Sequence, residues 1–114
     1  MEKPNKTEIG KRGEQLAKDF LIHNGYVVLE QNYRFKKGEV DLIVMKDNWI
    51  VFVEVKLRKN NHFGNPEEFV SNNKIRLVHD CATHYLNEHN LKMNLRFDIV
   101  SITENVIEHF EDAF

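Results

Sequence analysis

The order of hydrophobic and polar residues along the chain changes its period several times. Between residues 7 and 24, apolar and small residues recur every three or four positions, which predicts an amphipathic helix. Residues 26–35 are then rich in aromatic and β-branched side chains, which favour a strand, and the Lys-Lys-Gly run after them supplies turn chemistry. The chain is therefore predicted to begin with one helix followed by one strand.

Two further strands are predicted at residues 39–46 and 49–58. They are joined by an Asp-Asn pair at residues 47–48, which tolerates the positive φ of a two-residue hairpin turn. This turn fixes a register in which the numbers of opposed residues sum to 95. One face of the hairpin is wholly apolar, so we expect it to be buried. The residues on that face are Val40, Leu42, Val44, Val51, Val53, Val55 and Leu57.

A second helix is predicted from the run Asn65-Pro66-Glu67-Glu68, which supplies an N-cap, a proline in the first turn and acidic residues after it. Its apolar stripe continues to about residues 89–90, although the polar run Ser71-Asn72-Asn73 could split it into a short turn and a longer helix. Two short strands, at 96–102 and 106–110, follow it. The predicted order is αβββαββ, which is an α/β architecture.

Composition limits the class of protein. A chain of 114 residues, with 41% hydrophobic and 30% charged residues, predicts one globular domain over residues 1–114. We expect a cytoplasmic protein without a membrane partner. The longest apolar runs, at residues 42–45 and 49–53, are too short to span a membrane, the first residues do not resemble a secretory signal, and Cys81 is the only cysteine. Residues 1–60 carry 12 Lys or Arg against 9 acidic residues, which permits nucleic-acid binding without establishing it.

The second face of the hairpin begins as apolar core and ends as a charged cluster. In the predicted register Asp41 faces Glu54, and Glu39 faces Lys56. Two carboxylates about 5 Å apart repel by roughly 3 kcal/mol at an effective dielectric constant of about 20. Lys56 neutralises part of this charge, and Mg²⁺ or Mn²⁺ between Asp41 and Glu54 would neutralise the rest. A solvent-facing network of salt bridges would explain the same spacing.

Other charged residues extend this cluster. Glu14 lies on the flank of the first helix's apolar face, beside small residues that let the helix approach a sheet, although a capping or solvated glutamate is the alternative. Lys74 occupies a position on the apolar stripe of the second helix, where it must find a partner or snorkel. Further basic or amide residues in the turns could meet a phosphate backbone, although charged turns are usually solvated. These are Arg34, Lys36, Lys37, Arg58 and the loop at 60–63.

The hairpin sequence resembles a known motif. Gly38-Glu39-Val40-Asp41, followed by Glu54-Val55-Lys56, is similar to the PD-(D/E)XK nuclease motif with valine in place of proline. Short blocks across nearly the whole chain also resemble the small bacterial YraN family. These blocks are Gly10-x-x-Gly13-Glu14-x-x-Ala17, Asn32-x-Arg34, Phe63-Gly64-x-Pro66, Ala82-x-x-Tyr85-Leu86, Arg96-Phe97-Asp98 and Glu108-His109-Phe110.

The resemblance implies a restriction-endonuclease-like fold, with an αβββαβ core and a central mixed sheet flanked by helices, similar to Holliday-junction resolvases. It also implies a Mg²⁺- or Mn²⁺-dependent endonuclease that hydrolyses phosphodiester bonds, with DNA, including branched or junction DNA, as the expected substrate. Cleavage of two strands would need a homodimer, which is a hypothesis. The alternative is a non-catalytic nucleic-acid-binding or assembly module that retains the fold.

The resemblance also assigns roles by position. Asp41 is the principal metal ligand, Glu54 the second ligand, and Glu14 a helix carboxylate that helps to hold the metal or its water. Lys56 orients or activates water, and Lys74 is a basic residue near the site. Glu39 is an accessory candidate. The residues expected to contact nucleic acid are Arg34, Lys37, Arg58 and Lys74.

Overall fold

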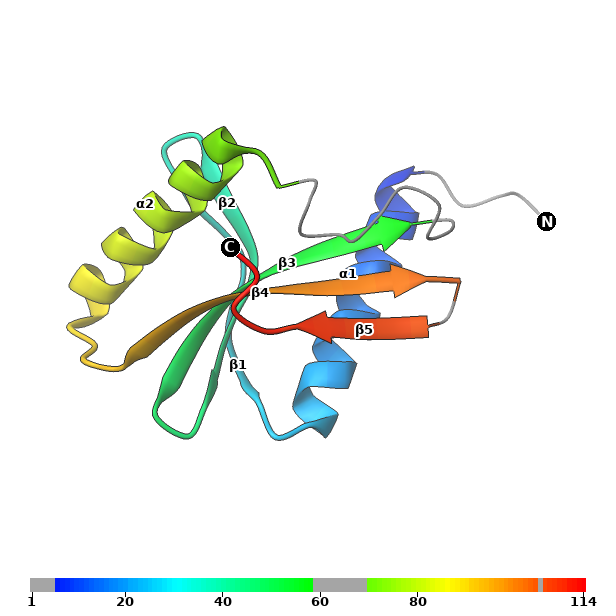
Figure 1. Ribbon diagram of the computed structural model, residues 1–114, viewed down its shortest axis with the longest axis horizontal. Coiled ribbons are helices and arrows are strands. Elements are labelled where there is room, and N and C mark those ends of the chain that lie inside the picture. The colour runs from blue at the N-terminus through cyan, green and yellow to red at the C-terminus, as the bar shows by residue number, and fades with distance from the viewer. Residues whose placement is uncertain (1–5, 59–69, 105) are drawn as a thin grey trace.

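The computed structural model describes residues 6–58, 70–104 and 106–114, and its elements confirm the predicted αβββαββ order (Figure 1). Their boundaries lie within a few residues of the predicted ones, wherever the chain is described. The elements are α1 (Lys6–His23), β1 (Val27–Phe35), β2 (Gly38–Lys46), β3 (Trp49–Arg58), α2 (Asn72–His89), β4 (Asn94–Thr103) and β5 (Val106–Phe110).

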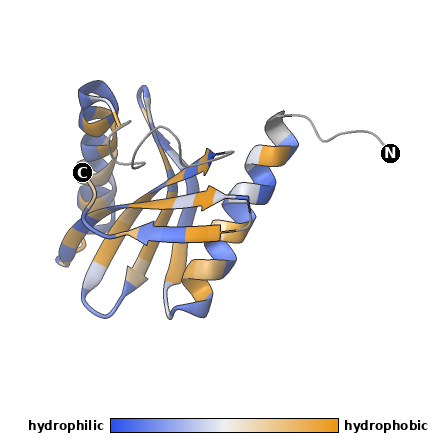
Figure 2. Ribbon diagram, turned by 45° about the vertical axis from the view of Figure 1, so that its right-hand side comes forward, coloured by the Kyte–Doolittle hydropathy of each residue, from blue (hydrophilic) through white to orange (hydrophobic). Residues whose placement is uncertain are grey.

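The strands of the described residues form one mixed sheet in the order β1-β2-β3-β4-β5, in which only β3 and β4 are parallel. Both helices mix hydrophobic and hydrophilic residues (Figure 2), and each packs an apolar side against the sheet. Ala17 and Leu21 of α1 join the core on one face, whereas Val78, Cys81 and Tyr85 of α2 join the core on the other. This is the predicted α/β, restriction-endonuclease-like core, with β5 added at one edge.

The hairpin register is confirmed over its paired part. The opposed residues run from Lys46 and Trp49 to Leu42 and Val53, as the predicted turn requires. Within the described residues the pairing of β2 with β3 ends there. Beyond that point the two strands part, and the predicted opposition of Asp41 and Glu54 is not a rung of the ladder.

The prediction that Val40 shares a face with Leu42 is wrong. Val40 belongs to the core beneath α2, whereas Leu42 belongs to the core beneath α1. The side-chain alternation changes where β2 leaves β3, and from that point β2 is paired with β1 alone. β2 lies close to α2 at Gly38, since a Cβ there would lie 2.6 Å from the backbone oxygen of Leu77.

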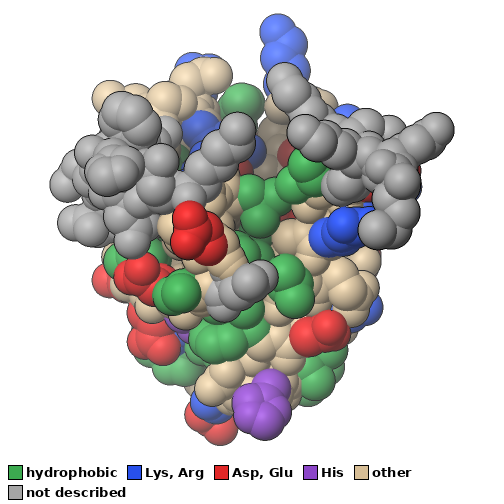
Figure 3. Space-filling view, turned by 90° about the vertical axis from the view of Figure 1, so that its right-hand side faces the viewer, with side chains coloured by type: hydrophobic (Ala, Val, Ile, Leu, Met, Phe, Trp, Pro, Cys, Tyr) green, Lys and Arg blue, Asp and Glu red, His purple; other side chains and the backbone are tan. Residues whose placement is uncertain are grey.

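The prediction that Leu57 is buried is also wrong, because 41% of its surface is exposed. It lies at the end of β3, where Gly13 of α1 covers it on one side. Figure 3 views this side of the molecule, where β3 and β4 end, and shows hydrophobic side chains gathered on it. An apolar groove of about 430 Å³ lies between Leu57 and the α1 residues Ile9 and Leu16.

Helix α2 begins at the polar run that the sequence offered as a break. Ser71 is its N-cap and accepts a hydrogen bond from the Lys74 N–H at 3.1 Å, while Asn90 ends the helix in the left-handed conformation with φ of 50°. The predicted start at residues 65–68 lies outside the described residues.

Among the described residues, neither helix has the length and apolar character needed to cross a membrane.

Gly38 provides a direct test of how closely α2 approaches the sheet. We expect Gly38→Ala to lower the free energy of unfolding by about 1 to 3 kcal/mol, because its Cβ would press on the backbone of α2. Gly10→Ala is the matched control, since a Cβ there meets nothing within 4 Å and alanine favours a helix interior by up to about 1 kcal/mol. Urea titration of both variants measures the difference, and equal stabilities would contradict the packing.

Candidate functional site

The candidate site is built where β2 parts from β3. At this point the Asp41 carboxylate accepts a hydrogen bond from the Val55 N–H, with 2.8 Å between Oδ2 and the nitrogen. A side-chain oxygen of β2 therefore satisfies a backbone donor of β3 beyond the end of the ladder. This bond holds the Asp41 side chain beside the backbone that carries Glu54.

The electrostatic environment of Asp41 is unfavourable for a negative charge. Burial is the largest influence, and together with the charge of Glu54 it raises the pKa of Asp41 to about 7, with a smaller contribution from Glu14 in the same direction. The Val55 N–H and the positive charge of Lys74 act in the opposite direction. Asp41 is therefore a carboxyl group that exchanges its proton close to neutral pH.

Glu54 is a buried carboxylate with 8% of its surface exposed, and it lies between two lysines. The Lys56 Nζ is 3.7 Å from its Oε1, and the Lys74 Nζ is 3.4 Å from its Oε2. Oε2 is buried and accepts no hydrogen bond from the described residues. Because buried carboxylate oxygens nearly always have such a partner, this oxygen retains the capacity to bind another group.

Lys74 reaches the site from the first turn of α2. The Ser71 cap holds the backbone of Lys74, and its side chain crosses to Glu54 on β3. Of the two sequence-based interpretations of Lys74, the structure favours a charged partner in the cluster. Lys56 comes from β3 itself, two residues after Glu54.

Glu14 approaches from the opposite side of the sheet, on α1, and is half-buried. Its charge acts on Asp41, although α1 and α2 cover different faces. Both helices influence the same carboxylate because it lies at the gap between β2 and β3. The structure thus brings together the residues that the sequence singled out as catalytic candidates: Glu14, Asp41, Glu54 and Lys56, with Lys74 beside them.

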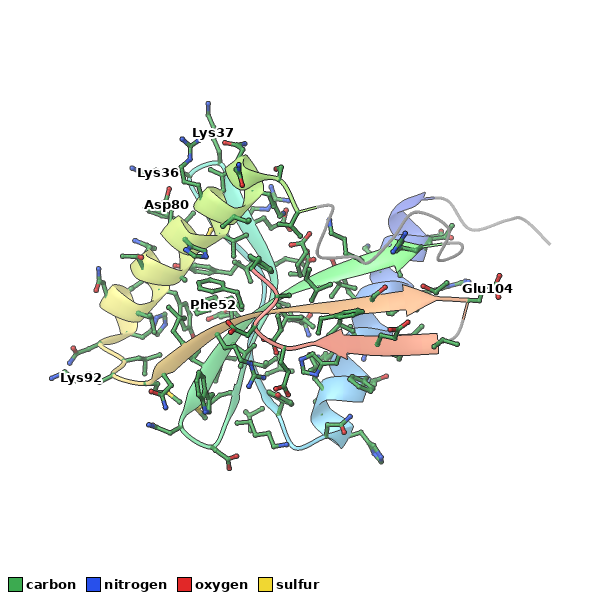
Figure 4. The ribbon with its side chains drawn as sticks, viewed as in Figure 1. Lys36, Lys37, Phe52, Asp80, Lys92 and Glu104 are labelled. Atoms are coloured by element: carbon green, nitrogen blue, oxygen red, sulfur yellow. The ribbon has the colours of Figure 1, made fainter. Side chains whose placement is uncertain are left out.

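The remaining predicted residues lie elsewhere or have other partners. Glu39 forms an ion pair with Arg34 across β1 and β2 at 3.4 Å, so its charge is already balanced. Lys37 is exposed in the turn between these strands, next to the start of α2 (Figure 4). Arg58 is half-buried at the end of β3. The predicted loop at 60–63 lies outside the described residues.

The donor set determines which metal the site fits. Among the described residues, no three His, Cys, Asp or Glu side chains are arranged to hold a metal ion together. Mg²⁺ does not require such a cage, because it usually keeps several waters and binds through one or two carboxylates. Asp41 and the unsatisfied oxygen of Glu54 fit that requirement. Glu14 fits the role of holding a water of the metal better than that of a direct ligand.

A second buried carboxylate was missed by the sequence analysis. Asp98 on β4 is fully buried and pairs with the Arg96 guanidinium through two hydrogen bonds of 2.8 Å. His109 Nε2 lies 2.6 Å from it, and the Asp112 N–H donates to it at 3.0 Å. Burial alone would raise the pKa of Asp98, but these hydrogen bonds hold it below its usual range. The sequence did contain a signal for this network, because Arg96, Asp98 and His109 all lie in blocks that resemble the YraN family.

The family model and the similar proteins found by comparison agree on one family. The model described as "Uncharacterised protein family UPF0102" matches residues 13–102. The UPF0102 protein of Christiangramia forsetii is 42% identical over 111 residues, covering 94% of this chain and 93% of that protein. Its counterpart from Flavobacterium psychrophilum is 43% identical with the same coverage, and one from a Sulfurihydrogenibium species is 44% identical over 96% of both chains. None of these names states an activity or a ligand.

The raised pKa of Asp41 predicts an unusual dependence of stability on pH. Its pKa is about 7 in the folded protein and about 3.9 in an unfolded chain, so the native state binds the extra proton between these values. Without divalent metal, the free energy of unfolding should therefore fall as pH rises from about 4 to about 7. Asp41→Asn removes this titration and keeps an oxygen for the Val55 N–H, so it should be more stable than wild type at pH 8, by more than about 1 kcal/mol.

Urea titration in EDTA across this pH range measures the effect. Asp80→Asn, at an exposed position of α2, is the matched control and should follow the wild-type profile (Figure 4). Parallel profiles for wild type and Asp41→Asn would show that Asp41 is not held in a strained environment.

Proposed function

The chain belongs to the uncharacterised protein family UPF0102, and from that premise we propose that it is a divalent-metal-dependent endonuclease that hydrolyses phosphodiester bonds in nucleic acid. Membership confirms the predicted resemblance to the YraN family, and the activity is our inference from the site. The observation that carries it is Glu54, a buried carboxylate whose Oε2 accepts no hydrogen bond from the described residues, beside the Asp41 carboxyl group, whose pKa is raised to about 7.

The energetics of the site support a cationic ligand. The buried Glu54 and the half-buried Asp41 are held close together, and the hydrogen bond from Val55 keeps Asp41 there despite the unfavourable charge of Glu54. Such an arrangement lowers the free energy of unfolding, and arrangements of this kind cluster at functional sites. A divalent cation would reverse the balance, since it favours the ionised form of both carboxylates.

Each residue of the cluster would have its own role in phosphodiester hydrolysis. Asp41 and Glu54 would hold Mg²⁺ or Mn²⁺, which supplies a Lewis acid for the phosphate and lowers the pKa of a water. The Lys56 Nζ, 3.7 Å from Glu54, can donate to a phosphoryl oxygen and stabilise its developing negative charge. Glu14 can accept a proton from the attacking water and orient it. Lys74 keeps the Glu54 carboxylate in place through its contact with Oε2.

DNA is the substrate that we propose, including branched and junction DNA. The described residues of one chain present one such cluster, so cleavage of both strands of a duplex would require a second copy, and we include a homodimer in the proposal. Light scattering at high protein concentration tests this part separately.

One observation favours a different function. Lys56 and Lys74 already neutralise Glu54 without any metal, which is what a purely structural charge cluster would show. The second candidate is therefore a non-catalytic module that keeps this fold and binds nucleic acid or a protein partner. It predicts DNA binding without cleavage, whereas the endonuclease predicts both.

The decisive experiment is cleavage of labelled single-stranded, duplex, flap and four-way-junction DNA with Mg²⁺ or Mn²⁺. Asp41→Asn and Lys56→Met should each lower the rate at least about 100-fold, because each removes a group that acts on the scissile phosphate or its metal. Asp80→Asn and Lys92→Met are the matched controls, because they make the same charge changes at exposed positions away from the site. Asp80 lies on α2 and Lys92 follows its end, and both variants should keep the wild-type rate (Figure 4).

All variants should be purified in the same way, so that a contaminating nuclease gives equal rates in every preparation. Metal-dependent products that persist in Asp41→Asn would refute the assignment of the site. Absence of products with every substrate and metal, while DNA still binds, would favour the non-catalytic module.

A further inference from the structure

A polar groove of about 300 Å³ lies between α1 and β1, next to the candidate active site. Its α1 wall consists of residues at positions 11, 14, 15 and 18, which share one face of the helix because they are three or four residues apart. This face is separate from the apolar one, through which Ala17 and Leu21 pack on the sheet. The residues that line the groove are Lys11, Glu14, Gln15, Lys18, Gln31 and Asn32.

The charges of the groove connect it to the active site. Glu14 in its wall is the carboxylate whose charge reaches Asp41. Lys11 and Lys18 lie about one turn before and one turn after Glu14 on the helix. The groove therefore lies beside the proposed active site through Glu14. Its two lysines place positive charges along the same face of α1. In a chain whose net charge is only −2, a nucleic acid must be attracted by such a local arrangement.

The spacing of the two lysines suits a nucleic-acid strand. Seven residues of helix separate them, which corresponds to about 10 Å along the axis of α1. One strand of DNA carries a phosphate every 3.4 Å or so along its helix axis, so this distance covers about three phosphates. Gln15 is less available, because its amide donates to Asp19 at 2.8 Å.

The β1 wall has an unusual backbone at Asn32. This residue has φ of 51° inside a strand, a left-handed conformation that asparagine tolerates better than most residues. β1 is also the edge strand of the described sheet, so no further strand covers Asn32 from that side among the described residues. Asn32 is exposed and lines the groove at this irregular point of the backbone. Backbone irregularities of this kind cluster at sites that contact ligands.

We propose that the groove between α1 and β1 binds the sugar-phosphate backbone of the nucleic-acid strand next to the scissile phosphate, through Lys11 and Lys18 with the amides of Gln31 and Asn32 beside them. The inference rests on the proposed function, since it names how the substrate of that same site is held. Contacts with phosphate position a strand without reading its bases. Binding in this groove is therefore independent of sequence.

The salt dependence of DNA binding tests this directly. Fluorescence anisotropy in EDTA, between about 50 and 200 mM NaCl, gives the slope of log affinity against log salt without any cleavage. The double variant Lys11→Met, Lys18→Met should reduce the magnitude of the slope by about 1.4 on single-stranded DNA and about 1.8 on duplex DNA, because two phosphate contacts are lost. Lys92→Met, at an exposed position beyond the end of α2, should leave the slope unchanged (Figure 4).

A second variant separates loss of charge from loss of folding. Lys11→Arg, Lys18→Arg keeps both charges and should retain the wild-type slope, and all variants should unfold at the same urea concentration. A Lys11→Met, Lys18→Met slope equal to that of Lys92→Met would overturn the inference, and so would absence of DNA binding by the wild type.

The failure of this inference differs from the failure of the proposed function. If the wild type binds DNA through the groove lysines but cleaves no substrate, the groove assignment stands and the endonuclease does not. If the wild type cleaves DNA with an unchanged slope in the methionine variant, the endonuclease stands and the groove assignment is refuted.

Discussion

The hydrogen bond from the Val55 N–H to the Asp41 carboxylate is the interaction on which the rest of the site depends. It occupies the place where β2 and β3 stop pairing, and it replaces a rung of the ladder by a side-chain contact. Where the strands separate, Glu14 from α1 and Lys74 from α2 both act on Asp41, although these helices cover opposite faces of the sheet. Lys74 also forms an ion pair with Glu54.

Asp98 shows that this fold can bury a carboxylate without strain. Four hydrogen bonds, from Arg96, His109 and the Asp112 backbone, lower the pKa of Asp98 although it is fully buried. At the candidate site the balance is the reverse, because burial and Glu54 raise the pKa of Asp41 and one oxygen of Glu54 accepts no hydrogen bond from the described residues. This contrast is what the proposed cation site requires, because a bound cation would supply the partner that Glu54 Oε2 lacks among the described residues and would favour the ionised form of Asp41.

Local patterns predicted most of the architecture. The Asp-Asn turn determined the register from Lys46 and Trp49 to Leu42 and Val53, because a two-residue turn leaves no freedom in pairing. The prediction failed for Val40, because side-chain alternation assumes a continuous ladder. Val40 lies outside the paired part of the hairpin, whose last pair is Leu42 and Val53. The exposure of Leu57 depends on how far α1 covers the sheet, and no periodicity in one strand reports that distance.

The candidate site was predictable in part. The residue types of Asp41, Glu54 and Lys56 at their spacing indicated a charged cluster, and the structure gathers them with Glu14 and Lys74. The groove beside Glu14 and the network around Asp98 were not predictable in the same way. Each joins residues that are far apart in the sequence, such as Lys18 with Asn32 in the groove, so their proximity depends on tertiary packing.

The central claim is that Asp41 and Glu54 together bind a divalent cation. Anomalous diffraction from crystals soaked in Mn²⁺ tests it most directly, because it locates the metal without relying on activity. The account predicts one anomalous peak within about 2 to 2.6 Å of a carboxylate oxygen of both residues. The absence of a peak there, in crystals that hold Mn²⁺ elsewhere or nowhere, would contradict it.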